Sequence, residues 1–409
     1  ISSDAHAEGS RTLYPASYPP GGARADLDVS EPFTKYAGQV ARRAFLYVYA
    51  ETGEYIVTGS RNRNAGGDIR IYNPQNFGKR GDETVPSTPD FTCSGGSTQP
   101  GTHYAGAGRG VIASRMQELA GPNSASGAVT VPNGFVPCAY QAPVSGVYGV
   151  ILTGAPSAST GVPNGSIATP VTSTATISAW DVTIRTNATS TTDLNGRLFT
   201  FALVANTGGS NRRFYSQLFY VTEDGHRYRQ THRGIDGYGF ALYANNAGFL
   251  DSGNPLYRDI RGKDQTLAAL PSGISSTPAD LPVFFSDVAP AGPNADEVAK
   301  VLGAIGIPFI SLVPRVFYIR FVGAMGEGST RVGAGGNFIF QTTNTLTYEI
   351  LVSRDHVDFD PTNPQNRVLR GTARSGLHTI LWDGKDNAGN LFPAGLDYPF
   401  RLTGRNGEA

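Results

Sequence analysis

Short runs of alternating apolar and polar residues dominate the chain from Ala41 onward. The segments "RRAFLYVYAETGEYIVTGS", "GRLFTFALVAN" and "RRFYSQLFYVTEDGHRYRQT" are examples. In "ISAWDVTIRT", Trp180, Val182 and Ile184 alternate with Asp181, Thr183 and Arg185. A period of two is the one at which side chains line one face of a β-strand. The pattern therefore predicts an all-β chain of many short strands.

Two segments follow the helical period instead. In "RGVIASRMQELAG", three apolar residues recur at helical spacing. In "PNADEVAKVLGAIG", Asn294 and Glu297 occupy the two positions of a capping box ahead of further apolar residues at that spacing. We expect two short helices, with aligned apolar residues Ile112, Met116 and Leu119 in the first and Val298, Val301, Leu302 and Ile305 in the second.

Changes in composition divide the chain into consecutive segments. The first 35 residues have little periodicity and many Pro and Gly residues, which is typical of an arm. A Ser-, Thr-, Gly- and Pro-rich stretch in the middle resembles a linker. We expect an N-terminal arm (1–35), a jelly-roll-like β domain (36–155), a linker (156–175), a second β-sandwich (176–288), a helical inter-domain insertion (289–313) and an immunoglobulin-like domain (314–409).

Charge and hydropathy limit the classes of partner. The 33 basic and 33 acidic residues give no net charge, so no overall field attracts nucleic acid. Charged residues make up only 16% of the chain, against roughly 25% in typical soluble proteins. The longest apolar run, "VLGAIGIPFISLV", is shorter than the roughly 20 residues that span a bilayer. We expect no nucleic-acid partner and no membrane span.

Cys93 and Cys138 are the two cysteines, and both lie in the first predicted domain. A disulfide between them would contribute about 4 kcal/mol in the chain-entropy model. A buried thiol pair in a cytosolic protein is the alternative. The chain begins at Ile1 rather than Met, which indicates a processed or trimmed N-terminus. We favour a disulfide in a secreted protein.

No familiar catalytic motif is present in the sequence. It has no G-x-S-x-G, H-E-x-x-H, Walker A or C-x-x-C pattern. The segment "GAGRG" has no third glycine at the G-x-G-x-x-G spacing of a dinucleotide-binding loop. "HRYRQTHR", with His226 and His232, is typical of a solvated sheet face, and a saccharide- or nucleic-acid-binding patch is the alternative. We expect no enzyme and no catalytic residue.

Calcium is the one cofactor that the sequence suggests. The loop "RDHVDFDPTNPQN" supplies several hard oxygen ligands of the kind that Ca²⁺ binds. Their spacing differs from that of the D-x-D-x-D-G loop, and a series of Asx turns stiffened by Pro is the alternative. The candidate ligands are Asp355, Asp358, Asp360 and Asn363.

A second polar loop, "DGKDNAGN", also contains oxygen ligands, at Asp383, Asp386, Asn387 and Asn390. Lys385 would lie among them and repel a cation. Alternating segments lie on both sides of this loop, so we interpret it as the turn of a β-hairpin. Trp382 and Tyr398 are then its packing residues.

The C-terminal sequence "SGLHTILWDGKDNAGNLFPAGLDYPFRL" resembles the last hairpin of immunoglobulin-like domains related to that of the flagellar hook-capping protein. The shared pattern is W-D-G-x-D-x-x-G-N followed by A-G-x-Y, although Leu396 and Asp397 here separate Gly395 from Tyr398. "GSRTLYP", "AETGEYIVTGSRN" and "GRGVIASRMQELAGPNS" resemble the N-terminal part of large secreted bacterial surface proteins. They are also loosely similar to the jelly-roll pre-peptidase C-terminal modules of exported enzymes. These resemblances imply a secreted protein with a structural role.

Two functional hypotheses follow. The first is an extracellular structural or adhesive protein of a bacterial cell surface, a self-assembling subunit of a filament, sheath or layer. Its arm would add a strand to a sheet edge of a neighbouring copy, through Leu13, Tyr14, Tyr18, Leu27 and Val29. The alternative is a set of carbohydrate-binding modules of a secreted hydrolase, which would contact cell-surface polysaccharide through Tyr215, Tyr220 and Tyr228.

Overall fold

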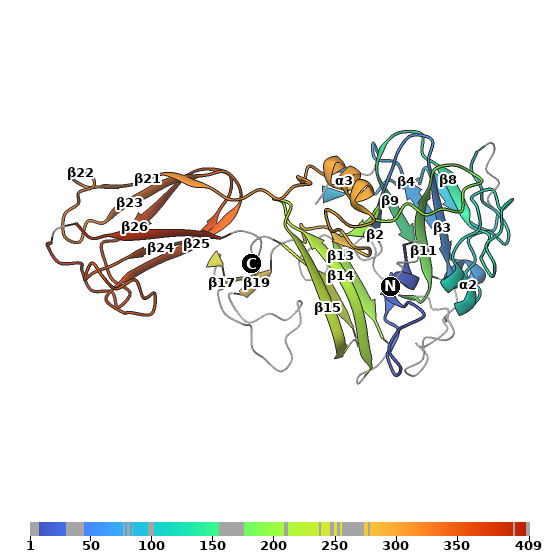
Figure 1. Cartoon of the computed structure of the whole chain (residues 1–409), viewed down its shortest axis with the longest axis horizontal. Helices are drawn as coiled ribbons and strands as arrows, with labels where there is room; N and C mark the ends of the chain where they lie inside the picture. Colours follow the sequence, from blue (N-terminus) through green and yellow to red (C-terminus); the bar gives the residue numbers. More distant parts are fainter. Residues whose placement is uncertain are drawn as a thin grey trace. The chain divides into compact units, whose positions relative to one another are not determined.

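The computed structural model shows a chain folded mainly into antiparallel β-sheets (Figure 1). The structure describes residues 8–29, 45–76, 78–79, 82–83, 85–96, 102–154, 176–207, 212–236, 239–245, 249–251, 254–255, 274–276, 279–395 and 397–405. The prediction of an all-β fold is confirmed. Contacts group the chain into two compact units.

Unit 1 falls within residues 1–222, 227–245 and 278–309. Its largest sheet has eight strands, in the order β15-β14-β20-β12-β2-β9-β4-β7. In chain order these are β2 (Phe45–Ala50), β4 (Ile69–Tyr72), β7 (Phe91–Cys93), β9 (Gly146–Leu152), β12 (Leu198–Thr200), β14 (Arg213–Val221), β15 (Arg227–Asp236) and β20 (Val283–Phe284).

Two smaller sheets complete the described layers of unit 1, together with the two-residue pair β5 (Gly78–Lys79) and β6 (Asp82–Glu83). One has the order β11-β3-β8, formed by β3 (Tyr55–Ser60), β8 (Cys138–Gln141) and β11 (Trp180–Arg185). The other has the order β10-β1-β13-β16, formed by β1 (Asp26–Asp28), β10 (Thr176–Ile177), β13 (Ala202–Asn206) and β16 (Phe240–Tyr243). A 3₁₀ helix, η1 (Arg61–Ala65), follows β3.

Strands on either side of residues 156–175 pair with each other. All of β11 pairs with β3, and β12 pairs with β2. The two sandwiches expected at 36–155 and 176–288 therefore form one unit, and the expected boundary lies inside it. Local alternation identifies a strand but carries no information about its partner, so the sequence pattern could not show this pairing.

The strand β11 is buried on both faces. Trp180, Val182 and Ile184 lie in the apolar core, as their alternation predicts. Asp181 and Arg185 are buried as well, at 2% and 1% exposure. The segment around Gly9 covers part of β11, where Gly9 forms a β-bridge with Asp181.

Three short α-helices occur among the described residues, one more than predicted. The extra one, α1 (Ser10–Leu13), is a single turn. α2 (Arg115–Ala120) lies where expected, but Met116 is 60% exposed and the buried residue of the helix is Glu118. The side of α2 that faces the interior thus carries a charged residue. The spacing of apolar residues cannot reveal such a side. None of the described helices is both long and apolar enough to cross a membrane.

The helix α3 (Ala295–Ala304) also forms, and Val298, Val301 and Leu302 are fully buried, as predicted. The expected capping box does not form. The Asn294 side chain donates to the Asp287 carbonyl instead, at 3.1 Å. The buried apolar face of α3 belongs to the core of unit 1, so this helix is part of that unit and not an insertion between domains.

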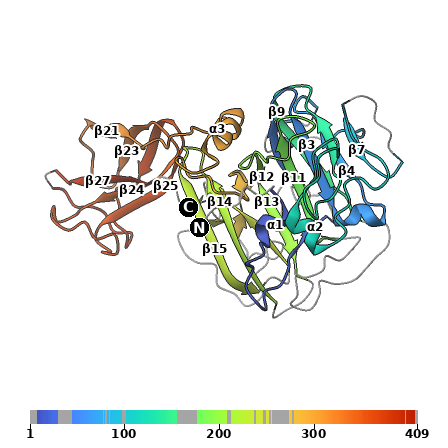
Figure 2. The same ribbon diagram turned by 45° about the vertical axis from the view of Figure 1, so that its right-hand side comes forward.

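Unit 2 falls within residues 223–226, 246–277 and 310–409. Two sheets form a β-sandwich (Figure 2). Its apolar core includes Phe340 and Ile350. The first, in the order β22-β21-β23-β26, contains β21 (Val316–Gly323), β22 (Gly326–Glu327), β23 (Gly336–Thr342) and β26 (Gly376–Trp382). The second, in the order β25-β24-β27, contains β24 (Leu346–Val352), β25 (Arg367–Ala373) and β27 (Phe400–Arg405). A small further sheet contains β17 (Phe249–Asp251), β18 (Asn254–Pro255) and β19 (Ile274–Ser276).

The loop "DGKDNAGN" connects the two sheets of this sandwich. β26 pairs with β23, whereas β27 pairs with β24. The prediction of a β-hairpin between the last two strands is therefore wrong. The loop does form a tight turn, closed by a single bridge between Lys385 and Leu391. The sequence on both sides of a turn has the same alternating pattern whether the two flanking strands pair with each other or each pairs with a different strand.

Candidate functional site: a buried ionic network around the N-terminal segment

Residues 8–29, here named the arm segment, are an integral part of unit 1. β1 is an inner strand, with Leu27 opposite Ile177 of β10 on one side and opposite Ala205 of β13 on the other. The Val182 amide donates to the Glu8 carbonyl at 3.0 Å, and the Ala23 amide donates to the Arg213 carbonyl at 2.7 Å. α1 contacts β11 and β14, beside which Figure 2 shows it.

The five residues expected to contact a neighbouring copy pack against their own chain. The rings of Tyr14 and Phe214 lie 6.4 Å apart, and those of Tyr18 and Tyr215 lie 6.1 Å apart. Tyr18 is half-buried. The other four are buried, namely Leu13, Tyr14, Leu27 and Val29. The expectation of a free arm is therefore corrected, because its apolar side chains belong to the core of unit 1.

The centre of the network is an ion pair between Arg24 and Glu118, both fully buried. The guanidinium binds the carboxylate through two contacts, of 2.9 and 2.7 Å. Arg115 binds the same carboxylate at 2.6 Å, and the Ser10 hydroxyl donates to it at 2.5 Å. Burial alone would raise the pKa of Glu118, but the charge and hydrogen bonds of Arg24 lower it below its ordinary value.

Two further contacts hold the Arg24 guanidinium. It donates to the Ser178 carbonyl, and it lies 4.7 Å from the centre of the Tyr14 ring. Burial lowers the pKa of Arg24, whereas the Glu118 carboxylate raises it, and the net shift is upward. This pair therefore stays charged, and neither member is stable in the interior without the other.

A second cluster joins α1 to β11 and to the loop that follows it. Asp193 binds Arg11 at 3.0 Å and Arg185 at 2.6 Å. Asp181 lies 3.9 Å from Arg11 and accepts a hydrogen bond from Thr183 at 2.8 Å. Burial raises the pKa of Asp181 to about 7, against the opposing charge of Arg11.

A third cluster surrounds Arg197, which is fully buried. Its guanidinium binds Glu54 at 3.0 Å and also pairs with Glu297 of α3. Glu8 of the arm segment accepts from the backbone amides of Arg197 and Leu198, at 3.0 and 2.8 Å. Burial raises the pKa of Glu8 to about 7 despite these hydrogen bonds.

Asp26 is the second acidic residue of the arm segment that lies in the interior, at 1% exposure. It accepts from the Thr176 hydroxyl at 3.4 Å. Burial raises the pKa of Asp26 to about 7, while the charge of Arg24 opposes the shift. The carboxyl groups of Asp26, Glu8 and Asp181 therefore gain or lose a proton near neutral pH. All three lie in the arm segment or against it.

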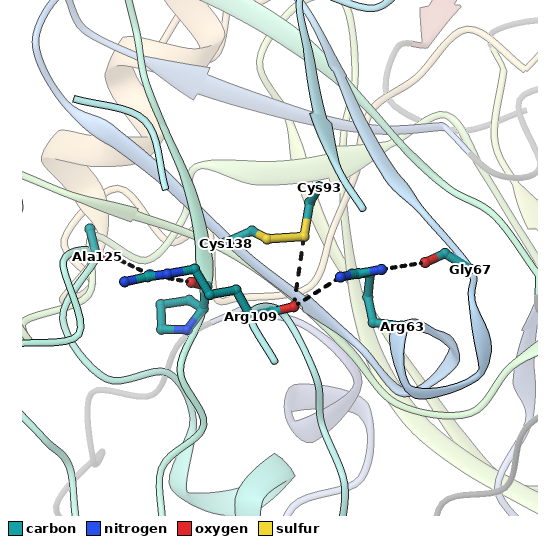
Figure 3. Close-up of a disulfide and its surroundings, with 7 residues drawn as sticks. Arg63, Gly67, Cys93, Arg109, Ala125 and Cys138 are labelled. Carbon is teal, nitrogen blue, oxygen red and sulfur yellow. Dashed lines mark hydrogen bonds between the residues drawn. A yellow bond between two sulfur atoms is a disulfide. The ribbon is translucent and has the colours of Figure 1, made fainter. Parts of the chain in front are cut away.

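The disulfide between Cys93 and Cys138 is present and fully buried (Figure 3). It joins β7 of the large sheet to β8 of the three-stranded sheet, so it crosslinks two layers of unit 1. Gly110 has φ +69°, and a Cβ there would lie 2.9 Å from the Cys93 sulfur. The position therefore requires glycine.

Two arginines brace the chain beside the disulfide. Arg109 donates to the carbonyls of Ala125 and Pro137, at 3.1 and 2.9 Å (Figure 3). Arg63 donates to the carbonyls of Gly67 and Arg109, at 3.0 and 3.4 Å. Buried backbone acceptors around the disulfide are thus satisfied by charged donors.

In unit 2, the four residues considered for calcium form a series of Asx turns. Asp355 accepts from the Asp358 amide at 2.7 Å, Asp358 from the Asp360 amide at 2.8 Å, Asp360 from the Thr362 amide at 2.8 Å, and Asn363 from the Gln365 amide at 2.9 Å. Backbone amides lower the pKa of Asp355, and the hydroxyl and then the amide of Thr362 lower the pKa of Asp360. Within the described ranges, no three His, Cys, Asp or Glu side chains are grouped as metal ligands. The geometry matches the Asx-turn alternative.

The two polar loops of unit 2 bind each other. The Asn387 amide donates to the Asn366 carbonyl at 2.8 Å, and the Val368 amide donates to the Asn387 side chain at 3.0 Å. Asp386 is fully buried and pairs with Arg354 at 3.0 Å. The two motifs that suggested metal binding therefore form one hydrogen-bonded end of the sandwich.

The tyrosines considered for sugar stacking do not form an open platform. Tyr220 is 7% exposed, and its hydroxyl donates to Gln230 at 2.6 Å. Tyr215 and Tyr228 are half-buried. His232 is also buried, 2.8 Å from the Ser216 hydroxyl. The "HRYRQTHR" run lies mainly in β15, which is an edge strand. Exposed and partly buried side chains do not alternate regularly along this strand.

Replacing Glu118 with Gln should destabilise unit 1 by about 3–5 kcal/mol, because Arg24 would remain as an uncompensated buried charge. Trp180 lies in unit 1 and Trp382 in unit 2, so urea unfolding followed by fluorescence in a Trp382→Phe background reports unit 1. The control is Asp68→Asn in unit 1, which breaks a partly exposed pair with Arg70 and should cost less than about 1 kcal/mol. Equal effects of the two substitutions would contradict this assignment.

The stability of unit 1 should fall as the pH rises from 5 to 8. Glu8, Asp26 and Asp181 have ordinary pKa values of 4.5, 3.8 and 3.8, raised to about 7 in the fold. Their protonation stabilises the fold fully below the ordinary values, and this stabilisation is lost as the pH rises through about 7. The measurement is the unfolding free energy reported by Trp180. Asp26→Asn should flatten the slope, and a stability that rises over this range would show the sign to be wrong.

Millimolar calcium or a chelator should leave the thermal midpoint of unit 2 unchanged, because backbone amides already bind one carboxylate oxygen of each of the three aspartates. Fluorescence of Trp382 in a Trp180→Phe background measures this midpoint. A calcium-dependent increase that Asp358→Asn abolishes would restore the metal hypothesis.

Comparisons of the chain with protein-family models, with curated proteins and with solved structures found no match.

Proposed function

We propose that the chain is an extracellular structural or adhesive protein, a subunit of a filament, sheath or layer on a bacterial cell surface. The observation that carries this proposal is the Cys93–Cys138 disulfide, buried between two layers of unit 1. Disulfides form and persist mainly in oxidising compartments outside the cytosol. A buried crosslink between sheets suits a protein that must keep its shape without cellular repair.

The arm segment supports a load-bearing role. It enters the sheets near the N-terminal end of the described chain and is held by the ion pairs of Arg11 and Arg24. Its strand β1 has neighbours on both sides. Pulling on this end of the protein would have to break buried ion pairs and strand hydrogen bonds together, which resists local opening.

An exposed apolar face on unit 2 supports contact with other molecules. Leu377 and Leu381 lie on the same face of β26 and are 67% and 70% exposed. Exposed apolar side chains grouped on one sheet often mark an interaction surface. The carbohydrate-binding alternative has less support, because the tyrosines that it requires pack into unit 1.

Purified full-length protein should form regular assemblies, visible by negative-stain electron microscopy and as a concentration-dependent increase in sedimentation. Leu377→Glu combined with Leu381→Glu should weaken assembly, because both place charge on the exposed apolar face. Met116→Glu, on the exposed side of α2 in unit 1, is the matched control. Monodisperse monomers at all concentrations would contradict the proposal.

A further inference from the structure

The strands β14 and β15 form a two-stranded ribbon at one end of the large sheet (Figure 1). Every residue of β14 pairs with one of β15, and β15 is the last strand of the sheet. On one face of the ribbon, Phe214 and Leu218 are fully buried in the core of unit 1. Successive side chains of a strand point to opposite faces. The other face is buried at Phe219 and Val221, near the turn that joins the strands, and is exposed beyond them.

Two arginines of β15 lie on this exposed face. Arg229, Thr231 and Arg233 are exposed, whereas His232 is buried on the core side of the ribbon. Arg229 and Arg233 are four residues apart, so their Cα atoms are separated by about 13 Å along the strand. Gln217 lies opposite Thr231 and is also exposed. The two arginines therefore flank a hydroxyl group and a carboxamide.

A third arginine joins this face from β14. Tyr215 lies opposite Arg233, and the exposed Arg213 is two residues before Tyr215 on the same strand. Gly234 is the extra residue of a β-bulge at this point and has φ +88°. An added Cβ at Gly234 would be 3.1 Å from the Tyr215 hydroxyl and 3.6 Å from Cδ of Arg213. The bulge glycine thus leaves room for both of these side chains beside Arg233.

The three arginines, here named the arginine face, are not neutralised by the protein. None of them has an ion pair or a side-chain hydrogen bond with any residue that the structure describes. β14 contains no acidic residue, and β15 contains one, Asp236, at its end. In contrast, the buried Arg24 and Arg197 of unit 1 bind carboxylates. The ribbon is therefore locally positive in a chain that has no net charge.

The groups on the arginine face indicate which anion would fit. A guanidinium group presents a planar fork of donors that matches a carboxylate. Between the arginines lie hydroxyl and amide groups, which suit a partner rich in hydroxyl groups. Single-stranded nucleic acid would require aromatic rings on which its bases stack. Tyr215 is only half-buried but packs against Tyr18, and Phe219 is buried. These features favour an extended, hydroxyl-rich polyanion over a nucleic acid.

We propose that the arginine face binds an acidic polysaccharide, whose carboxylates pair with the guanidinium groups of Arg213, Arg229 and Arg233. Its sugar hydroxyls would bind Thr231 and Gln217 between them. This inference rests on the proposed function, since it names a class of ligand for an adhesive role at a cell surface. It requires no stacking of sugars on tyrosine, so the packing of the tyrosines into unit 1 does not oppose it.

Binding of fluorescently labelled oligogalacturonate to the full-length protein, measured by anisotropy, tests the proposal. The double variant Arg229→Gln/Arg233→Gln should bind about tenfold more weakly, because each exposed ion pair contributes up to about fivefold in affinity. Added salt should weaken binding to the unmodified protein, because it screens exposed charges. The control is Arg320→Gln/Arg331→Gln, which removes the same charge at exposed positions of unit 2 and should leave the affinity unchanged.

The two variants and two further ligands give each outcome a meaning. Weaker binding in the β15 variant alone supports the inference. No binding, equal weakening by both variants, or equal binding of neutral dextran overturns it. Tighter binding of oligothymidylate that the β15 variant abolishes would assign the arginine face to nucleic acid and also overturn it. The thermal midpoint reported by Trp180 should be unchanged in the β15 variant, and Arg213→Gln replaces this variant if it fails to fold.

The same protein also separates this inference from the proposed assembly. Regular assemblies that do not bind oligogalacturonate overturn the inference and leave the proposed function intact. Monomers that bind it through the arginine face support the inference and contradict assembly. Monomers that do not bind it contradict both.

Discussion

The buried ion pair between Arg24 and Glu118 is the interaction on which the rest of unit 1 depends. Moving two charges into the interior is unfavourable unless every donor and acceptor is matched. Here Arg115 and Ser10 bind the carboxylate as well, and the Ser178 carbonyl accepts from the guanidinium. These contacts come from the arm segment, from α2 and from the residues between β10 and β11, so a single charge pair fixes three distant parts of the chain.

This constraint explains why the first two predicted domains form one unit. Once Arg24 is held, β1 lies between β10 and β13, and Gly9 lies against Asp181 of β11. The strands β2 and β3 pair with β12 and β11, and the disulfide ties β7 to β8. The arm segment and the disulfide thus both hold the layers of unit 1 together. The arm segment does so through ion pairs, and the disulfide does so through a covalent bond.

Much of the local structure could be predicted from the sequence. Alternation located β3, β11 and β14, and helical spacing located the buried residues of α3, because both signals depend on neighbouring residues. The pairing of strands and the burial of Glu118, Asp181 and Arg24 could not be predicted. Charged residues normally indicate a solvent-exposed face, and only the fold brings their partners close. The same limit applies to "DGKDNAGN", whose turn was foreseen but whose role as a link between sheets was not.

The central claim is that the arm segment is a built-in part of unit 1, held by buried ion pairs. Hydrogen exchange of the full-length protein, followed by mass spectrometry of its peptides, tests this claim most directly. The account predicts that peptides covering residues 8–29 are protected as strongly as those of β2 and β9, because the Ala23 amide donates to the Arg213 carbonyl, the Ala25 amide donates to the Tyr14 hydroxyl, and β1 is paired on both sides. Rapid exchange throughout residues 8–29, with β2 and β9 still protected, would contradict it.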